Sequence, residues 1–180
     1  MIRNYVMERF LERISLSKYR KNFILKGGML VSAMVGVDIR STLDIDATVK
    51  KLPLEIETTK DIIEEIIIII AIDDGITFTI KNASEIMDEA EYSGIRINLE
   101  AQLESMRTPI KVDISTGDVI TPQEISYIFQ LMFEERTISQ NPAHLKFACG
   151  KGAGFLAILL YRLLTAQQMC SCRLNCYTDL

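Results

Sequence analysis

The chain contains a single histidine, His144, among its 180 residues, and this scarcity limits the catalytic chemistry open to it. A hydrolase triad of the serine or cysteine type places a histidine between a nucleophile and a carboxylate. His144 is the only candidate and is poorly placed for this role, so no such triad can be assembled. Histidine-based acid–base catalysis is therefore not expected.

Cysteines are also few, and all of them lie in the last quarter of the chain. Cys149, Cys170, Cys172 and Cys176, together with His144, could supply four zinc ligands. Their spacing differs from the paired CxxC pattern of zinc ribbons and fingers, so we expect free thiols instead.

A signal peptide or a membrane-spanning segment is not expected from the sequence either. The opening stretch MIRNYVMERFLERI carries charges among its apolar residues, which is not typical of a signal peptide. No uninterrupted apolar run approaches the length of a membrane span. We therefore expect a cytoplasmic protein that does not cross the membrane.

The chain has no excess of positive charge, since 20 lysines and arginines face 24 aspartates and glutamates, for a net charge of −4. This argues against a broad basic surface for duplex DNA, although a local basic strip could still hold a nucleotide or an RNA end. Apolar residues make up 48% of the chain, which is enough for a packed core. The length fits one domain, with or without a small helical appendage.

Hydrophobic periodicity predicts an α/β (or α+β) fold, with a mixed twisted sheet flanked by helices. The isoleucine run from 66 to 70 has strand propensity, but the charged spacing and the length of 57–72 favour a helix. Two strands flanking the sequence SMRTP should form a hairpin. The expected helices are 3–15, 29–36, 57–72, 85–91 and 121–133, and the expected strands are 22–26, 43–49, 76–81, 94–103 and 109–115.

Asp44 and Asp46 stand one residue apart inside a strand-like run, and this is the most informative pattern in the chain. Side chains at i and i+2 of a strand share a face, so the two carboxylates should lie side by side while Ile45 enters the core. Adjacent carboxylates repel each other unless a cation neutralises them, and such hard oxygen ligands suit Mg²⁺. Asp113, in a second strand pattern, would complete a two-metal site for phosphoryl displacement.

Gly27 and Gly28 follow the first predicted strand and open the predicted helix 29–36. Free N–H groups at a helix start can hold phosphate oxygens, and a glycine allows the phosphate to approach the backbone. Each feature alone has a plain explanation, because an Asp-x-Asp pair is often only solvated and a glycine pair is often only a turn. Their order along the chain favours a nucleotide site.

These residues resemble the DNA polymerase β superfamily of minimal nucleotidyltransferases. More closely, the stretches FILKGGMLVSAMVGVDIRSTLDIDATVK, DDGITFTI, GIRINLEA, IKVDISTGDVITP and MFEERTIS are similar to the AbiEii family of nucleotidyltransferase toxins from bacterial toxin–antitoxin and abortive-infection loci. The resemblance covers about residues 1–139. It implies a Mg²⁺-dependent enzyme that transfers a nucleoside monophosphate from an NTP to an acceptor such as a tRNA 3′ end, with a cognate antitoxin as partner.

The resemblance also implies residue roles. Asp44, Asp46 and Asp113 would be the catalytic, metal-binding carboxylates. The glycine pair Gly27 and Gly28 would seat the triphosphate, assisted by Arg40 and by Thr42, which occupies the position of the family's small hydroxyl residue. Lys26, beside the glycines, could reach phosphate or could be a solvated strand end, and we favour the latter interpretation.

The chain departs from the family after residue 139. The family continues with a helix carrying an Ala-Glu-Lys lysine and then an arginine–aspartate helix, and neither is present here. The stretch GKGAG, residues 150–154, lacks the spacing of a phosphate loop and is interpreted as a turn. We therefore predict a nucleotidyltransferase core at 1–139 and an atypical tail at 140–180, consistent with a frameshifted or truncated gene. The alternative function is an inactive remnant that only binds nucleotide or an antitoxin.

Overall fold

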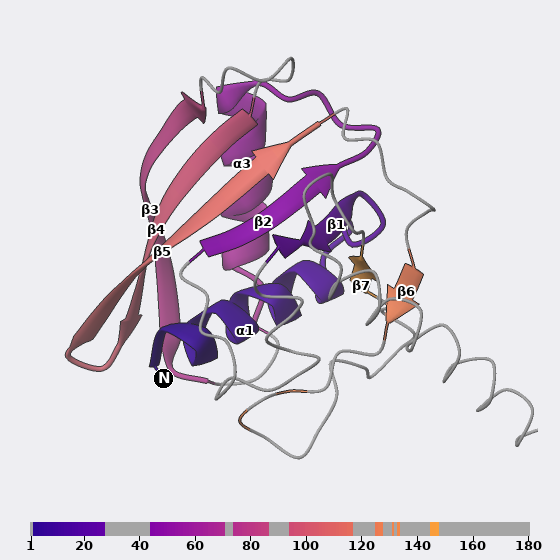
Figure 1. Cartoon of the computed structure of the whole chain (residues 1–180). Coiled ribbons are helices and arrows are strands. Elements are labelled where there is room, and N and C mark those ends of the chain that lie inside the picture. The colour runs from indigo at the N-terminus through magenta and orange to yellow at the C-terminus, as the bar shows by residue number, and fades with distance from the viewer. Residues whose placement is uncertain are drawn as a thin grey trace, which may run out of the picture.

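The computed structural model describes residues 2–27, 44–70, 74–86, 94–116, 125–127, 131, 133 and 145–147. Within these ranges the chain forms a mixed sheet of seven strands and two helices (Figure 1). This confirms the predicted α+β fold with a mixed, helix-flanked sheet. The predicted helix 29–36 lies outside the described residues, as do Gly28, Arg40 and Thr42.

The sheet has the strand order β3-β4-β5-β2-β1-β7-β6, so strands from the N-terminal part lie in its middle. Most neighbours are antiparallel, but β2 runs parallel to β5, and β1 runs parallel to β7. The strands are β1 (Phe23–Lys26), β2 (Asp44–Val49), β3 (Ile76–Ile86), β4 (Gly94–Leu103), β5 (Met106–Ser115), β6 (Ile125–Tyr127) and β7 (Leu145–Phe147).

Alternating side chains give the central strands one apolar and one polar face. On β2, Ile45, Ala47 and Val49 are buried in the core, while Asp44 and Asp46 on the other side are only partly covered. The same alternation runs along β4 and β5, where most of the buried residues at every second position are apolar. Period-two patterning of this kind leaves one face of an antiparallel or mixed sheet free to carry a site.

Two helices cover the apolar face. Helix α1 (Ile2–Leu16) packs against β5 and α3, and its Phe10 ring lies 5.7 Å from that of Phe78 on β3. Helix α3 (Ile56–Ile67) buries Ile62, Ile63 and Ile66 in the same core and passes behind the strands in Figure 1. The helix predicted over 57–72 is confirmed up to Ile67, where α3 ends, so residues 68–70 of the isoleucine run lie outside it.

Two predicted helices are wrong where the structure describes them. Glu85 and Ile86, expected in a helix over 85–91, continue β3 and pair with Ile95 and Gly94 of β4. Residues 125–127, inside the predicted helix 121–133, form β6 and pair with β7. In both cases a neighbouring strand offers backbone hydrogen bonds to a segment with β-branched or aromatic residues, and this tertiary partner overrides local propensity.

The predicted tail is described only at residues 145–147. This strand, β7, pairs with β1 through Ile24 and Leu25. Part of the segment after residue 139 therefore belongs to the sheet. The division into a core at 1–139 and a separate tail stays a prediction.

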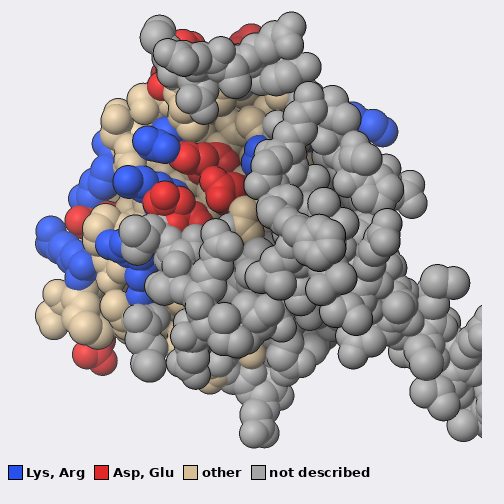
Figure 2. Space-filling model, viewed as in Figure 1, with Lys and Arg blue, Asp and Glu red and all other residues tan. Residues whose placement is uncertain are grey.

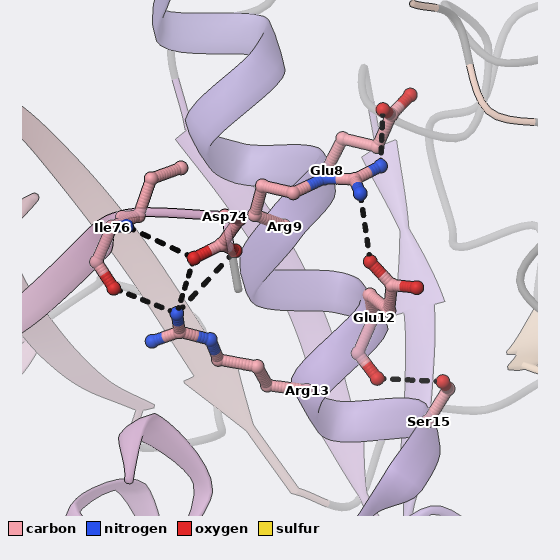
Figure 3. A network of polar contacts seen from close by, with 7 residues as sticks. All are labelled: Glu8, Arg9, Glu12, Arg13, Ser15, Asp74 and Ile76. Carbon is pink, nitrogen blue, oxygen red and sulfur yellow. Dashed lines mark hydrogen bonds and ion pairs between the residues drawn. The ribbon is translucent and has the colours of Figure 1, made fainter. Parts of the chain in front are cut away.

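Helix α1 carries charged side chains into the interior (Figure 3). Arg9 donates to Glu8 at 2.8 Å and lies 2.9 Å from the carboxylate of Glu12. One turn on, Arg13 reaches the Asp74 carboxylate at 3.1 Å and the Ile76 carbonyl at 2.8 Å, where β3 begins. It also donates to the carbonyl of Ile67 at the end of α3, at 2.9 Å. Arg13 thus joins α1, α3 and β3 through one guanidinium.

Candidate active site

The structure brings Asp44, Asp46 and Asp113 together on the polar face of the sheet. Asp46 and Asp113 are register partners on the parallel strands β2 and β5, and Asp44 lies two residues earlier on β2. All three are partly buried, while the residues between them fill the core. Side chains that share a register position in adjacent strands point to the same face, so the carboxylates are neighbours.

Four charged residues form one row across four adjacent strands. Lys26 on β1 is the register partner of Asp46, and Arg96 on β4 is the register partner of Asp113. The row therefore runs cation, carboxylate, carboxylate, cation, and Figure 2 shows acidic surface in a hollow over the middle of the sheet with basic side chains along one side. This order concentrates negative charge at the centre of the face and places positive charge at its borders.

Arg96 holds Asp113 through both carboxylate oxygens. Its Nε donates to Oδ1 at 2.8 Å and its Nη2 donates to Oδ2 at 2.7 Å. Such a two-point guanidinium–carboxylate pair is among the stronger hydrogen-bonded ion pairs in proteins. Contact with Asp113 raises the pKa of Arg96 further above its high ordinary value, so the guanidinium stays charged.

Sequence reasoning missed Arg96, although a signal was present. In GIRINLE the apolar residues alternate with Arg96, Asn98 and Glu100, which predicts that these three polar residues share the face opposite the core. The alternation alone could not place Arg96 beside Asp113, because that depends on the register between β4 and β5.

Lys26 crosses β2 instead of pointing into solvent. Its Nζ donates to the hydroxyl of Ser115 on β5 at 2.8 Å, and Ser115 lies 3.2 Å from the hydroxyl of Thr48. The interpretation of Lys26 as a solvated strand end is therefore wrong. Its ammonium group contributes positive charge beside Asp46, a second feature that only strand register reveals.

Gly27 lies directly against the carboxylate of Asp46. Its φ is +73°, and a Cβ built on it would meet Oδ2 of Asp46, with Cγ at 2.9 Å and Cβ at 3.1 Å. A side chain here would be strained by the backbone and would displace the carboxylate. The described geometry thus gives Gly27 a role next to Asp46, while its predicted contact with phosphate stays a prediction.

Asp46 carries the electrostatic cost of this arrangement. Burial raises its pKa, and the negative charges of Asp113 and Asp44 raise it further, while Lys26 and Arg96 act in the opposite direction. Like charges that share a site disfavour ionisation of at least one member. A cation bound beside Asp46 would remove this penalty.

The chemistry of these three carboxylates fits Mg²⁺, which prefers hard oxygen ligands. Their arrangement does not form a closed set, because within the described ranges no three Asp, Glu, His or Cys side chains are placed to hold a metal ion. Both oxygens of Asp113 are engaged by Arg96. The alternative zinc ligands, the four cysteines and His144, lie outside the described residues.

Among the residues that the structure covers, no helix is long and apolar enough to cross a membrane.

Comparison with known proteins gives one family and two structures. The sequence model of the family described as nucleotidyl transferase AbiEii toxin, type IV toxin–antitoxin system, matches residues 9–148. No curated protein was found that matches the chain. The crystal structure of JHP933 from Helicobacter pylori is similar over 81% of this chain and 50% of its own, with a TM-score of 0.47 and 13% identity. That of an H. pylori protein provisionally described as a nucleotidyltransferase is similar over 80% and 51%, with a TM-score of 0.45 and 15% identity. The chain spans about half the length of these two proteins.

Proposed function

The chain belongs to the AbiEii family of nucleotidyltransferase toxins, and from this premise we propose that it transfers a nucleoside monophosphate from an NTP to an acceptor hydroxyl in a Mg²⁺-dependent reaction. The observation that carries the proposal is the register of β2 and β5, which sets Asp46 beside Asp113 with Asp44 two residues away. Paired carboxylates on neighbouring strands are the donor set that phosphoryl-transfer sites require.

In the proposed reaction the acceptor oxygen attacks the α-phosphorus of the NTP, and pyrophosphate leaves. Asp44 and Asp46 would hold Mg²⁺ from β2. Asp113, across from Asp46, would contribute a further ligand or accept the proton of the attacking hydroxyl. Bound Mg²⁺ would lower the pKa of that hydroxyl and neutralise charge on the triphosphate.

Positive and backbone groups would orient the nucleotide. Gly27 and Gly28 would admit the triphosphate close to the backbone, with Arg40 and Thr42 assisting. Lys26, held on the site face by Ser115, adds positive charge at the same end of the row. Orientation of the α-phosphorus against the acceptor is a major part of catalysis in such displacements.

We propose further that the acceptor is an RNA, such as a tRNA 3′ end, that the protein works in the cytoplasm, and that a cognate antitoxin restrains it. Family membership supports a nucleotide substrate and an antitoxin partner. The net charge of −4 supports a local contact with an RNA end over a wide grip on a duplex.

Labelled NTPs test the activity. The full chain is incubated with Mg²⁺, bacterial RNA and each of the four NTPs labelled on the α-phosphate. We expect label on RNA with one or more of them. Asp46→Asn should lower the rate about a hundredfold or more, because charge stabilisation by a metal at such a site amounts to several kcal/mol.

The matched control is Asp61→Asn, which makes the same chemical change at an exposed position of α3. It should transfer label as the unchanged chain does. Equal transfer by Asp46→Asn and the unchanged chain would show that the activity arises elsewhere.

A second candidate function is nucleotide binding without transfer. It is favoured by the engagement of both Asp113 oxygens by Arg96. A ligand that binds only the folded state raises the melting temperature by mass action. A rise with Mg²⁺ and NTP that Asp46→Asn abolishes, in a chain that transfers no label to RNA, would identify this case.

A further inference from the structure

Asp113 faces two partners of opposite charge. Asp46, its neighbour on β2, repels it, and Arg96, its neighbour on β4, holds it with two hydrogen bonds. The guanidinium therefore supplies at Asp113 the positive charge that a divalent cation would supply. A carboxylate whose two oxygens both accept hydrogen bonds from one guanidinium faces that guanidinium. The lone pairs of Asp113 are therefore less available to a metal on the Asp46 side.

Among the described residues no three carboxylates are placed to hold a metal ion, and this pairing turns Asp113 towards Arg96. Asp44 and Asp46 sit on the same strand, and Asp113, the register partner of Asp46, is the carboxylate on the adjacent strand that could add a third protein oxygen. As long as Arg96 keeps its two hydrogen bonds, the oxygens of Asp113 are bound to the guanidinium. A metal ion at the site and the guanidinium of Arg96 therefore compete for the Asp113 carboxylate.

We propose that Arg96 is a competitor of the divalent cation for Asp113, and that cation binding requires the guanidinium to release this carboxylate. The inference rests on the proposed function, because it assumes that the carboxylates bind a metal. It goes beyond that function by giving a defined role to a residue outside the carboxylate set.

Release is feasible because the pair is only partly covered. The side chains of Arg96 and Asp113 are 39% and 20% exposed, whereas that of Arg13, which joins three elements of the fold, is 4% exposed. Ion pairs that reach solvent contribute little net stability, so their partners exchange readily. A freed guanidinium at this border of the site would find the triphosphate of an incoming nucleotide, which accepts two-point hydrogen bonds as a carboxylate does.

A purely supporting role for Arg96 makes the opposite prediction. If the guanidinium only holds Asp113 in the correct orientation for a metal, removing it should weaken metal binding. If it competes with the metal, removing it should strengthen binding. Direct measurement of metal affinity separates the two roles without reference to catalysis.

The experiment measures Mn²⁺ binding to the full chain by electron paramagnetic resonance, with Mg²⁺ as the displacing ion. We expect Arg96→Gln to lower the Kd for Mn²⁺ about two- to fivefold, the range that corresponds to loss of one partly exposed ion pair. Arg96→Lys keeps the positive charge but loses the planar guanidinium that makes two hydrogen bonds. Its Kd for Mn²⁺ should lie between that of Arg96→Gln and that of the unchanged chain. Arg107→Gln, which removes the same charge from an exposed position of β5, should leave the Kd unchanged.

A double variant tests whether the gain in Mn²⁺ affinity of Arg96→Gln depends on Asp113. In an Asp113→Asn background, Arg96→Gln should produce no gain in affinity, because the contested carboxylate is absent. Persistence of the gain in that background would mean that Arg96 acts through its charge alone and would overturn the proposal. An unchanged or higher Kd in Arg96→Gln, with normal binding by the unchanged chain, would also overturn it while leaving the proposed function intact. Absence of Mn²⁺ binding in every variant would remove the metal from the proposed function and this inference with it.

Discussion

A carboxylate placed beside two others costs free energy in the folded state, and Asp46 is the residue that bears this cost. Its pKa is raised by burial and by Asp113 and Asp44. Between the ordinary value of 3.8 and the raised value, the folded state binds more protons than the unfolded state. Stability due to this group is therefore fully present below the ordinary pKa and is lost as pH rises through the folded pKa.

The first prediction follows from this loss of stability with rising pH. Without divalent cations, Asp46→Asn should have a higher melting temperature than the unchanged chain at neutral pH, because the uncharged amide avoids the repulsion. The difference should shrink as pH falls and vanish below the ordinary carboxylate pKa. Thermal unfolding from pH 3 to pH 8 measures it. Asp61→Asn is the control, and an Asp46→Asn protein less stable than the unchanged chain at pH 7 would contradict the assignment.

Gly27 offers a second prediction at the same scale, with a matched control in Gly75. Both have positive φ, +73° and +65°, so alanine at either position should cost about 1 kcal/mol through backbone strain. An added Cβ at Gly75 meets only Leu103 Cδ1 at an ordinary 3.6 Å, whereas at Gly27 it would strike the Asp46 carboxylate.

Unfolding in urea should therefore show a loss of stability in both variants, larger in Gly27→Ala. Only Gly27→Ala should also lose the rise in melting temperature caused by Mg²⁺ and NTP. The assigned role of Gly27 beside Asp46 would be wrong if both variants kept that rise.

Among the elements, α1 has polar contacts with α3 and with the start of β3 through one buried side chain, that of Arg13. Arg13→Met replaces the aliphatic part of the arginine side chain but removes its guanidinium. The Asp74 carboxylate, which is 8% exposed, is then left without its cationic partner. Removing one member of a buried ion pair costs about 3–5 kcal/mol. We expect a loss of about that size in urea unfolding, with partial recovery in Arg13→Met/Asp74→Asn.

The control for Arg13 is Lys18→Met, because Lys18 and Glu65 form an exposed pair with 67% and 50% of their side-chain surface accessible. Loss of that pair should barely change stability. Similar effects of the Lys18 and Arg13 substitutions would mean that the buried network does not connect the elements.

The elements also show what sequence patterns can and cannot predict. The strand around Asp44 and Asp46 and the hairpin of β4 and β5 follow from alternation and turn position, and both are confirmed. The helix expected at 85–91 is wrong where it is described, because Glu85 and Ile86 extend β3 along a long partner strand. Local composition carries no information about the length of that partner.

The same limit applies to the site. Spacing along one strand places Asp44 beside Asp46, but Arg96 and Lys26 become part of the site only through pairing between strands. Register depends on the whole sheet, and a single sequence without related sequences does not determine it.

At the scale of the whole molecule, the extent of the folded unit is open to a direct test. The family match ends at residue 148, and β7 at 145–147 adds to β1. A chain cut after residue 148 should keep the sheet and its cooperative unfolding. A chain cut after residue 139 loses β7 and exposes the edge of β1, so it should unfold at a lower temperature or aggregate. Equal stability of the two would support the core boundary predicted at 139.

The parallel pairing of β2 with β5 also sets the time at which the site can exist during protein synthesis. Asp44 and Asp46 leave the ribosome first, followed by α3, β3 and β4, and Asp113 emerges only with β5. Pairings between distant segments form after local ones. The growing polypeptide therefore lacks the pairing of Asp46 with Asp113 until β5 has been made and has paired with β2. Any activity that needs Asp113 beside Asp46 is therefore absent from every partial chain that ends before β5.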